Sequence, residues 1–412
     1  MRVLDRRRLL VSALAVGAAA ATGRAFGQGR GLAAFGARGD GSSDDTAALR
    51  QALSSGQIID GGGRTYGVSG ALEIGSGFRG LANCTLKQLA RDDHLRTLQI
   101  QGARDFHISN VTVIRGEQND EVLIQRDMQS NAGLWIQDCA AFTLDHVAVH
   151  GGGIGTGLVV FHCDSFIASD LRASGIHYQL HARPADDMLQ GLWFQMSSRF
   201  QVLRPVVTDL GGQDDQGFSR DNNRAIAVSG CSDFKIVDLD VSQCGQGLDV
   251  TGAAGNHDFE IAGGHASDCY SWGFKFANSA FRGRVHDATA ERCGDGGFVV
   301  SARTKPSDPP PQDVEIADCR ALDCGRQGSD NTTFGFGLLH TKTEDDWPRK
   351  VRFLRCHAED RRSPPGMKWG FFNEINTPPG QGNTLEDCTQ SGALVAPSRG
   401  FGKKALAELE AH

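Results

Sequence analysis

One phrase, repeated about nine times between residues 106 and 390, constrains the fold of this chain more than any other feature. It reads aromatic-x-aliphatic, a few residues, aliphatic-x-aliphatic, a turn, then Gly-aliphatic-x-aliphatic. One copy is FKIVDLDV, SQCGQ and GLDV, starting at Phe234, and the interval from Phe142 to Phe166 is 24 residues. Short alternating runs between turn residues are typical of strands. A repeat of this period without helical spacing predicts coils of three short strands, stacked as a parallel β-helix.

The composition fits one continuous solenoid. At 412 residues the chain is long enough for two domains, but a solenoid of this length forms a single body. Its 53 glycines suit a fold that turns several tight corners in every coil. A formal net charge of −7 argues against a nucleic-acid-binding protein, because such a protein needs a basic face.

Residues 1–25 resemble an export signal. Arg6 and Arg7 precede a short apolar run that begins at Leu9, and small residues follow near Gly23. This order is typical of a secretory signal peptide rather than a membrane span. The paired arginines make it resemble a twin-arginine signal, with a general secretory signal or an anchor as the alternative. We therefore expect a periplasmic or secreted protein whose mature part has no membrane span.

Eleven cysteines in an exported chain suggest disulfides, but their positions suggest ladders of buried thiols instead. Equivalent positions in successive coils lie about 4.8 Å apart, and a free cysteine packs as a small hydrophobic residue. No set has the CxxC spacing of a zinc site. Three ladders are predicted: Cys244, Cys269, Cys293 and Cys324; Cys319, Cys356 and Cys388; and Cys139, Cys163 and Cys231.

The N-terminal part of the mature chain carries a capping motif. Residues 35–41, FGARGDG, form a Gly-rich turn, and the following SSDDTAALRQAL predicts a helix from about Asp44 to Leu53. Ser43 or Asp44 can cap this helix, which would close the first open coil of a solenoid. With the repeats up to about residue 390, the motif resembles the pectate lyase superfamily, which includes polygalacturonases and phage tailspikes.

The resemblance implies an all-β fold, a single-stranded right-handed parallel β-helix with an N-terminal capping helix. We assign this domain to residues 26–395 and expect a tail or short helix over residues 396–412. An activity does not follow, because the superfamily includes lyases, hydrolases, epimerases and non-catalytic adhesins.

Two features of polygalacturonases are missing. Those enzymes carry paired aspartates directly before the Gly-aliphatic strand and a Gly-His-Gly one coil later. Here Asp214 and Asp215 lie in a loop about ten residues before the strand at Ala225, and no Gly-His-Gly occurs. The row of aspartates of calcium-dependent pectate lyases is not obvious either. The sequence therefore indicates no cofactor, with Ca²⁺ the one that the family leaves open.

The Gly-aliphatic strands line the binding groove in superfamily members, and their residues alternate between the coil interior and the outer surface. An exposed outward column is therefore predicted: Trp135, Val159, Trp193, Ala227, Asp249, Lys275 and Val299. Its two tryptophans can stack on sugar rings or, alternatively, pack under long loops. Its aspartate and lysine, about 4.8 Å apart, can orient a sugar or form a surface ion pair.

Two long loops, residues 176–190 and 211–224, precede consecutive strands of this column. Long loops on a rigid scaffold tend to carry function. Proton abstraction from a uronate needs a cation at the carboxylate and a nearby base. The candidate bases are His177, Tyr178 and His181, and the candidate cations are Arg183, Arg220, Arg224 and Lys275.

The same loops hold a second set of candidates, all carboxylates. Glycoside hydrolysis needs two carboxyls about 5–5.5 Å or 6.5–9.5 Å apart, and Asp249 with Asp221 or Asp215 can meet this requirement. Each loop residue can equally be a solvated charge or a turn former. A further polar cluster either extends the groove or marks the end of the solenoid: Arg303, Lys305, His340, Lys342, Lys368, Asn373 and Glu374.

The leading hypothesis is an exported enzyme that cleaves an acidic, uronate-containing polysaccharide by β-elimination. A glycoside hydrolase using paired aspartates is the main alternative. A C5-epimerase and a non-catalytic polysaccharide-binding or cell-surface protein are the others. The polymer, its linkage and the oligomeric state are left open by the sequence.

Overall fold

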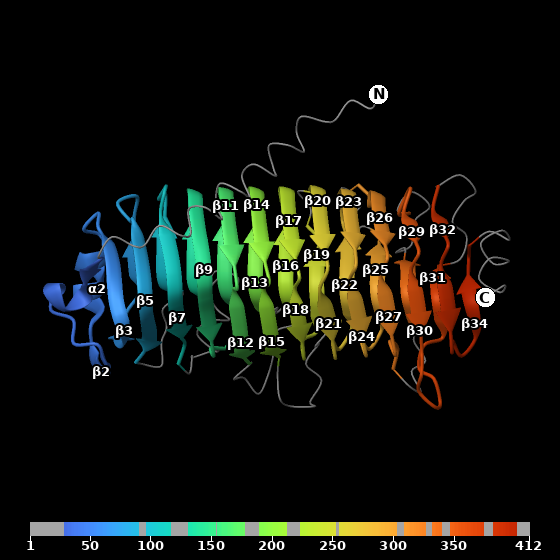
Figure 1. Ribbon diagram of the computed structural model, residues 1–412, viewed down its shortest axis with the longest axis horizontal. Helices are drawn as coiled ribbons and strands as arrows, with labels where there is room; N and C mark the ends of the chain where they lie inside the picture. The colour runs from blue at the N-terminus through green and yellow to red at the C-terminus, as the bar shows by residue number, and fades with distance from the viewer. Residues whose placement is uncertain are drawn as a thin grey trace, which may run out of the picture.

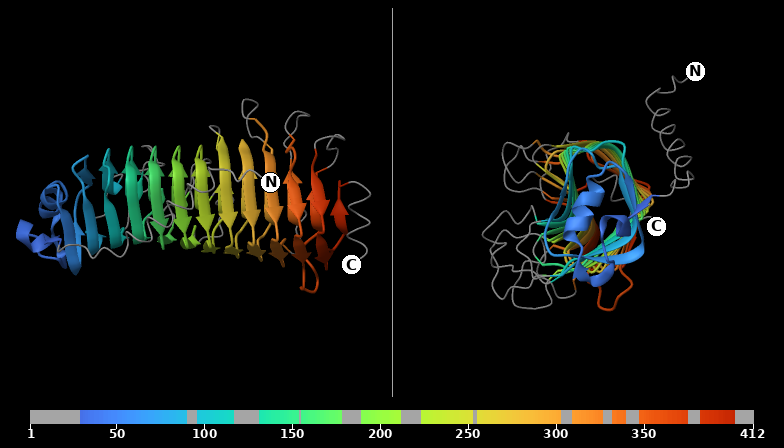
Figure 2. Two further views of the ribbon diagram at one scale, coloured as in Figure 1. Left: turned by 45° about the horizontal axis from the view of Figure 1, so that its top comes forward. Right: turned by 90° about the vertical axis from the view of Figure 1, so that its left-hand side faces the viewer.

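The chain forms a right-handed parallel β-helix, as the repeat predicts, with its coils stacked along one long axis and a helical cap at the N-terminal end (Figure 1). The computed structural model describes residues 29–89, 96–116, 131–153, 155–177, 189–211, 223–252, 255–302, 309–326, 332–339, 347–374 and 382–401. Viewed along the axis, the coils superimpose into one outline (Figure 2). Buried apolar side chains fill the interior of the coils.

All strand pairs between neighbouring coils are parallel, and they form two sheets. Sheet B has twelve strands: β4 Leu72–Ile74, β6 Arg96–Gln101, β8 Ala132–Gln137, β10 Thr156–Phe161, β13 Gln190–Gln195, β16 Arg224–Ser229, β19 Gln246–Val250, β22 Trp272–Ala277, β25 Gly296–Ser301, β28 Phe334–Leu339, β31 Trp369–Asn373 and β34 Ala396–Arg399.

Sheet A has twenty-two strands: β1 Arg30–Gly31, β2 Asp40–Asp44, β3 Ile58–Val68, β5 Gly80–Gln88, β7 His107–Ile114, β9 Ala140–His150, β11 Asp164–Ser169, β12 Arg172–Ile176, β14 Ser198–Leu203, β15 Val206–Leu210, β17 Ser232–Val237, β18 Asp240–Ser242, β20 Asn256–Ala262, β21 His265–Ser267, β23 Ala280–His286, β24 Thr289–Glu291, β26 Gln312–Ala317, β27 Arg320–Leu322, β29 Arg352–Leu354, β30 His357–Glu359, β32 Thr384–Glu386 and β33 Thr389–Ser391.

Each coil contributes one strand to sheet B and, beyond β9, two strands to sheet A. The long strand β9 pairs with both β11 and β12, and from there two separate ladders run on to β32 and β33. The aromatic-x-aliphatic, aliphatic-x-aliphatic and Gly-aliphatic-x-aliphatic parts of the repeat are thus three strands of one coil. The prediction of three strands per coil is confirmed for the coils beyond β9, whereas β7 and β9 each run through both sheet A segments of their coil as one strand.

Stacked phenylalanines run through the core. From Phe106 to Phe259, the first aromatic residue of each repeat stacks on the one before. The ring centroids of Phe142 and Phe166 are 4.8 Å apart, and those of Phe166 and Phe200 are 4.7 Å apart. A second stack begins in sheet B, where Phe274 and Phe298 are 4.7 Å apart. Aromatic pairs in these arrangements stabilise a fold by more than the apolar area that they bury, so these stacks hold neighbouring coils in register.

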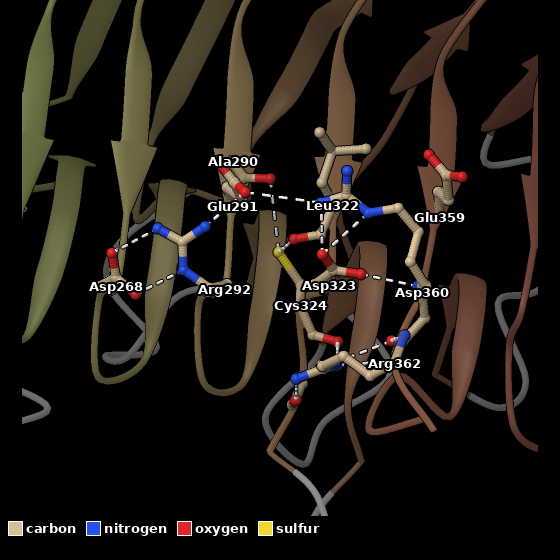
Figure 3. Close-up of polar contacts among 12 residues, drawn as sticks. Asp268, Ala290, Glu291, Arg292, Leu322, Asp323, Cys324, Glu359, Asp360 and Arg362 are labelled. Carbon is tan, nitrogen blue, oxygen red and sulfur yellow. Dashed lines mark hydrogen bonds and ion pairs between the residues drawn. The ribbon is translucent and has the colours of Figure 1, made fainter. Parts of the chain in front are cut away.

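Coil corners are formed largely by residues in the left-handed backbone region, and many of them are not glycine. Asp258, Asp268 and Asp323 have φ angles of 58°, 52° and 51°. Aspartate tolerates this region because its short side chain bonds locally. Arginines of the next coil often pair with these aspartates, as where Arg292 Nη2 lies 2.7 Å from Asp268 Oδ2 (Figure 3). The corners therefore depend on left-handed aspartates and other non-glycine residues as well as on glycines.

A ladder of alternating charge lies on the outer face of sheet A. In register across six strands are Lys235, Glu260, Arg284, Glu315, Arg352 and Glu386. Within this charge ladder, Lys235 Nζ lies 3.2 Å from Glu260 Oε1, and Arg352 Nη1 lies 3.2 Å from Glu315 Oε2. Because residues of opposite charge lie next to each other on neighbouring strands, they favour the observed strand register over a shifted one.

The cap differs slightly from its prediction. The helix α2 spans Thr46–Leu53, so it begins two residues later than Asp44, and Asp45 occupies the N-cap position. The Asp45 carboxylate accepts the backbone N–H groups of Arg38 and Gly39, which ties it to the preceding turn rather than to the helix. Asp44 still accepts the Thr46 N–H at 3.0 Å. A short 3-10 helix, η1 Leu32–Phe35, packs beside α2.

The C-terminal boundary also lies later than expected. Strand β34 pairs with β31, so sheet B continues past residue 395 into the segment expected to be a tail. The expected signal over residues 1–25 and the end of the expected tail lie outside the described residues. Within the described part of the chain, no helix combines the length and apolar character needed to cross a bilayer.

All eleven cysteines are buried and unpaired in disulfides, as the ladder prediction requires. The backbone N–H of Cys139 donates to Cys163 Sγ at 3.4 Å, so successive coils place these side chains one above another. Burial raises the pKa of the Cys231 and Cys244 thiols to about 12. These two thiols therefore act as small buried side chains, since a reactive cysteine needs a stabilised thiolate.

Candidate functional site

The outward column of sheet B has the register that the sequence predicts. Neighbouring strands pair Trp135 with Val159, Val159 with Trp193, Trp193 with Ala227, Ala227 with Asp249 and Asp249 with Lys275. The residue before each of these, from Leu134 to Phe274, lies in the core of the coil. The column residues Trp135, Val159, Trp193 and Ala227 form a separate apolar cluster on the outer face.

Apart from Lys275 the column is buried, which corrects the expectation that it is exposed. Trp135 and Trp193 are 5% and 6% exposed, and Asp249 has no exposed surface. Strand alternation fixes which side of the coil a residue faces, but it does not say whether water reaches that side. Of the two sequence-based alternatives for the tryptophans, the structure favours packing over open stacking faces.

At the centre of the face, one carboxylate lies between two cations. Asp249 Oδ2 is 2.6 Å from Arg224 Nε and 3.7 Å from Lys275 Nζ. The Arg224 and Lys275 side chains are 15% and 20% exposed, whereas the Asp249 side chain has no exposed surface. Asp249 faces outward, away from the coil interior. We call these three residues the charged triad.

Burial lowers the pKa of Lys275 below its usual range. Asp249 opposes this shift by stabilising the ammonium, and Arg224 adds to it by repulsion. A lysine whose charge is disfavoured is a better proton acceptor near neutral pH. Two cations against one carboxylate also leave a net positive charge, which suits an anionic ligand.

A second outward column lies three residues before the first and was missed from the sequence. It includes Gln190, Arg224 and Gln246, which are in register across β13, β16 and β19. Gln246 Oε1 accepts a hydrogen bond from Lys275 Nζ at 3.5 Å. The segments QGLW, RAIA and QGLD carry a signal for this column, since each puts a polar residue two positions before the inward aliphatic.

The two tryptophans of the face differ in what they leave unsatisfied. The ring of Trp135 is covered by the Arg96 guanidinium at 3.8 Å from its centroid, and its Nε1 donates to Gln137 Oε1 at 3.0 Å. Trp193 Nε1, in contrast, is buried without a hydrogen-bond partner among the described residues. One face of the Trp135 ring is therefore covered and is not open for stacking on a sugar.

His177 lies away from the charged triad. Its Nε2 is 2.8 Å from Asp209 Oδ1, and its side chain is 25% exposed. No contact between His177 and a triad residue occurs in the described part of the structure. Its place at the end of β12, where the first long loop begins, is as predicted, but its role as a base stays a prediction.

Most of the other predicted site residues cannot be placed. Outside the described residues lie Tyr178, His181, Arg183, Asp215, Arg220, Asp221 and Arg303, together with Asp214, Lys305, His340 and Lys342. Of the second cluster, Asn373 is 4% exposed and donates through Nδ2 to the Gly400 carbonyl. Lys368 and Glu374 border β31, on the C-terminal side of the triad.

One group of the described residues has the spacing of a metal site. Single ligand atoms of Asp145, His146 and Asp170 lie within 4.8 Å of one another, at a coil corner of sheet A. Arg204 Nη2 is 2.6 Å from Asp170 Oδ2, so a cation already holds one of these carboxylates. The corner is therefore better explained as another Asp–Arg pair.

Comparisons with known proteins agree with the fold. A model of the N-terminal extension of bacteriophage endosialidase matches residues 37–77, which include the cap. A search of curated protein sequences gave no significant match.

Three solved structures resemble the whole β-helix. The A-module of the mannuronan C-5 epimerase AlgE6 from Azotobacter vinelandii has a TM-score of 0.57 and 13% identity, covering 90% of this chain and 96% of that one. A family 28 exopolygalacturonase from Yersinia enterocolitica has a TM-score of 0.55 and 11% identity, covering 91% and 78%. PfbA, a surface adhesin of Streptococcus pneumoniae, has a TM-score of 0.60 and 12% identity, covering 88% and 90%.

These proteins differ in what they do, and the identities are low, so the likeness concerns the fold and not an activity. The chain thus has the right-handed parallel β-helix fold of pectate lyase-like proteins.

Proposed function

We propose that this chain is an exported enzyme that cleaves a uronate-containing polysaccharide by β-elimination, with the charged triad as its reaction centre. The observation that carries the proposal is a carboxylate without solvent exposure, held between two partly exposed cations on the outer face of sheet B. The likeness to an epimerase and an exopolygalacturonase supports a polysaccharide substrate. The N-terminal segment with paired arginines supports export to the periplasm or beyond.

Each triad residue has a role in this reaction. Arg224 pairs with the substrate carboxylate and offsets the negative charge that develops beside it. Neutral Lys275 takes the proton from C5 of the uronate, and its lowered pKa increases the neutral fraction. Asp249 is a positioning residue that holds the Arg224 and Lys275 side chains.

The electrons of the broken C5–H bond form a double bond between C4 and C5. The bond from C4 to the bridging oxygen breaks, and that oxygen leaves as a hydroxyl with a proton from the Lys275 ammonium or from water. The products are one new non-reducing end with an unsaturated uronate and one new reducing end.

A glycoside hydrolase would need a second carboxyl near Asp249, and the two candidates for it, Asp215 and Asp221, lie outside the described residues. Hydrolysis with Asp215 or Asp221 therefore stays an alternative that the assay below separates.

The test uses the mature protein with polymers of mannuronate, guluronate, galacturonate and glucuronate. We expect ultraviolet absorbance of the unsaturated uronate to rise together with reducing ends on at least one polymer. Lys275→Arg removes the base, because a guanidinium stays protonated, so turnover should fall by about 100-fold or more. Lys235→Arg is the matched control, because Lys235 also pairs with an acid but lies on sheet A.

The other outcomes contradict the lyase. Reducing ends without absorbance would indicate hydrolysis. Exchange of the C5 proton in deuterated water without cleavage would indicate epimerisation, and binding without any reaction would indicate a non-catalytic protein.

A further inference from the structure

Several buried polar atoms beside the charged triad have no hydrogen-bond partner among the described residues. They are Gln190 Oε1, Trp193 Nε1 and the two Asp249 oxygens, and within the described part of the chain Asp249 makes the ion pairs with Arg224 and Lys275 given above. Gln190 is 2% exposed and Trp193 is 6% exposed. A buried polar atom left unpaired costs free energy, so such atoms call for an explanation when several occur together.

The register of sheet B places the residues that carry these atoms near one small residue, Ala227. Trp193 pairs with Ala227, and Ala227 pairs with Asp249. Gln190 pairs with Arg224 in the adjoining column. Ala227 therefore has a large indole on one side and the triad carboxylate on the other, with its own methyl between them.

The chemistry of the unpaired atoms is complementary to a sugar hydroxyl. Gln190 Oε1 is an acceptor and needs an O–H or N–H donor, and Trp193 Nε1 is a donor and needs an oxygen. A hydroxyl provides both the O–H donor and the oxygen acceptor. The neighbouring Arg224 and Lys275 can bind a carboxylate. A uronate has both groups on one ring.

We propose that Gln190 and Trp193 form the hydroxyl-binding half of a uronate subsite whose carboxylate-binding half is Arg224 and Lys275. This inference rests on the proposed function for its substrate class. It adds a specificity: the subsite takes a uronate with free ring hydroxyls and rejects one that is O-acetylated. Acetylation removes the O–H that Gln190 needs and adds bulk beside two side chains, Gln190 and Trp193, that are almost completely buried.

The experiment measures binding, so that it does not depend on catalysis. Tetrasaccharides of the four uronates, each in free and O-acetylated form, are titrated into the Lys275→Arg chain, which keeps the cation but lacks the proposed base. We expect at least one free tetrasaccharide to bind, and its acetylated form to bind at least about tenfold more weakly.

In the same background, Trp193→Phe keeps a six-membered aromatic ring but removes the pyrrole ring with its N–H, and Gln190→Leu removes the acceptor. Each should weaken binding of the free tetrasaccharide by about fivefold to tenfold and bind the acetylated form with little change. Trp369→Phe on β31 and Gln201→Leu on β14 are the matched controls, and both should bind as the background does.

The inference is overturned if both site variants bind the free tetrasaccharide as tightly as the background, or if no uronate tetrasaccharide binds. It is also overturned if free and acetylated forms bind equally. Absorbance of the unsaturated uronate is measured separately on the unsubstituted chain. Binding with the expected discrimination but without cleavage would support the subsite and refute the lyase.

Discussion

Asp249 Oδ2 lies 2.6 Å from Arg224 Nε on the adjacent strand of sheet B, and the Asp249 side chain has no exposed surface. A pair in this setting depends on both partners, because each would otherwise leave a poorly solvated charge behind.

Asp249→Asn should destabilise the protein strongly, because it leaves Arg224 and Lys275 facing each other without the carboxylate between them. Breaking a buried pair costs about 3–5 kcal/mol in the free energy of unfolding. Thermal and denaturant unfolding measure the effect. Glu260→Gln removes a partly exposed carboxylate of the charge ladder and should cost about 1 kcal/mol or less. Equal losses for the two variants would show that Asp249 is not held as described.

Lys275→Met should change how stability depends on pH. Because burial lowers the folded-state pKa of Lys275 below its usual 10.5, the unfolded chain binds more protons in the interval between the two values. Burying the Lys275 ammonium costs free energy of folding, and this cost is present in full below the folded-state pKa. It decreases as pH rises through the interval, so stability increases there. We expect the unsubstituted chain to gain stability relative to Lys275→Met between neutral pH and pH 10.5. A difference that stays constant or moves the other way contradicts the shift.

The thiols should be unreactive in the native protein. All eleven cysteines are buried, and burial raises the pKa of the Cys231, Cys244 and Cys319 thiols to about 12. A chromogenic disulfide reagent should therefore titrate essentially none in the folded chain and all eleven in denaturant, without prior reduction. Fewer than eleven free thiols after denaturation would indicate a disulfide and contradict the ladder arrangement.

The left-handed corners should reject β-branched residues. Asp233 is exposed and has a φ of 53°. Asp233→Val should lower the free energy of unfolding by about 1–2 kcal/mol, because a β-carbon branch is crowded in this region. Asp233→Asn tolerates the same backbone and should differ little from the parent. Similar stability of the two variants would show that the corner relaxes without cost.

The fold was accessible from the sequence because it depends on a repeated local pattern. Alternation along each strand identifies Leu134 as inward and Trp135 as outward, and the repeat then aligns the coils. The corners were less accessible, since a left-handed aspartate such as Asp268 looks like any solvated aspartate until its φ angle is known.

The site was predicted only in part. Asp249, Lys275 and Arg224 were all named from the sequence, but Arg224 was assigned to a loop rather than to the column beside Asp249. Gln190 was overlooked because the alternation was followed only over the Gly-aliphatic part of the strand. Exposure was the property that could not be derived, since it depends on what covers the outer face and not on the strand itself.

The charge ladder of sheet A also limits how such a chain can change in length. Positive and negative residues alternate from Lys235 to Glu386, one per coil. Loss of the coil that carries Glu260 would bring Lys235 beside Arg284, and like charges would oppose each other. Loss of two successive coils would restore the alternation. The ladder thus distinguishes odd from even changes in coil number, so gain or loss of coils in this part of the protein is expected to proceed in pairs.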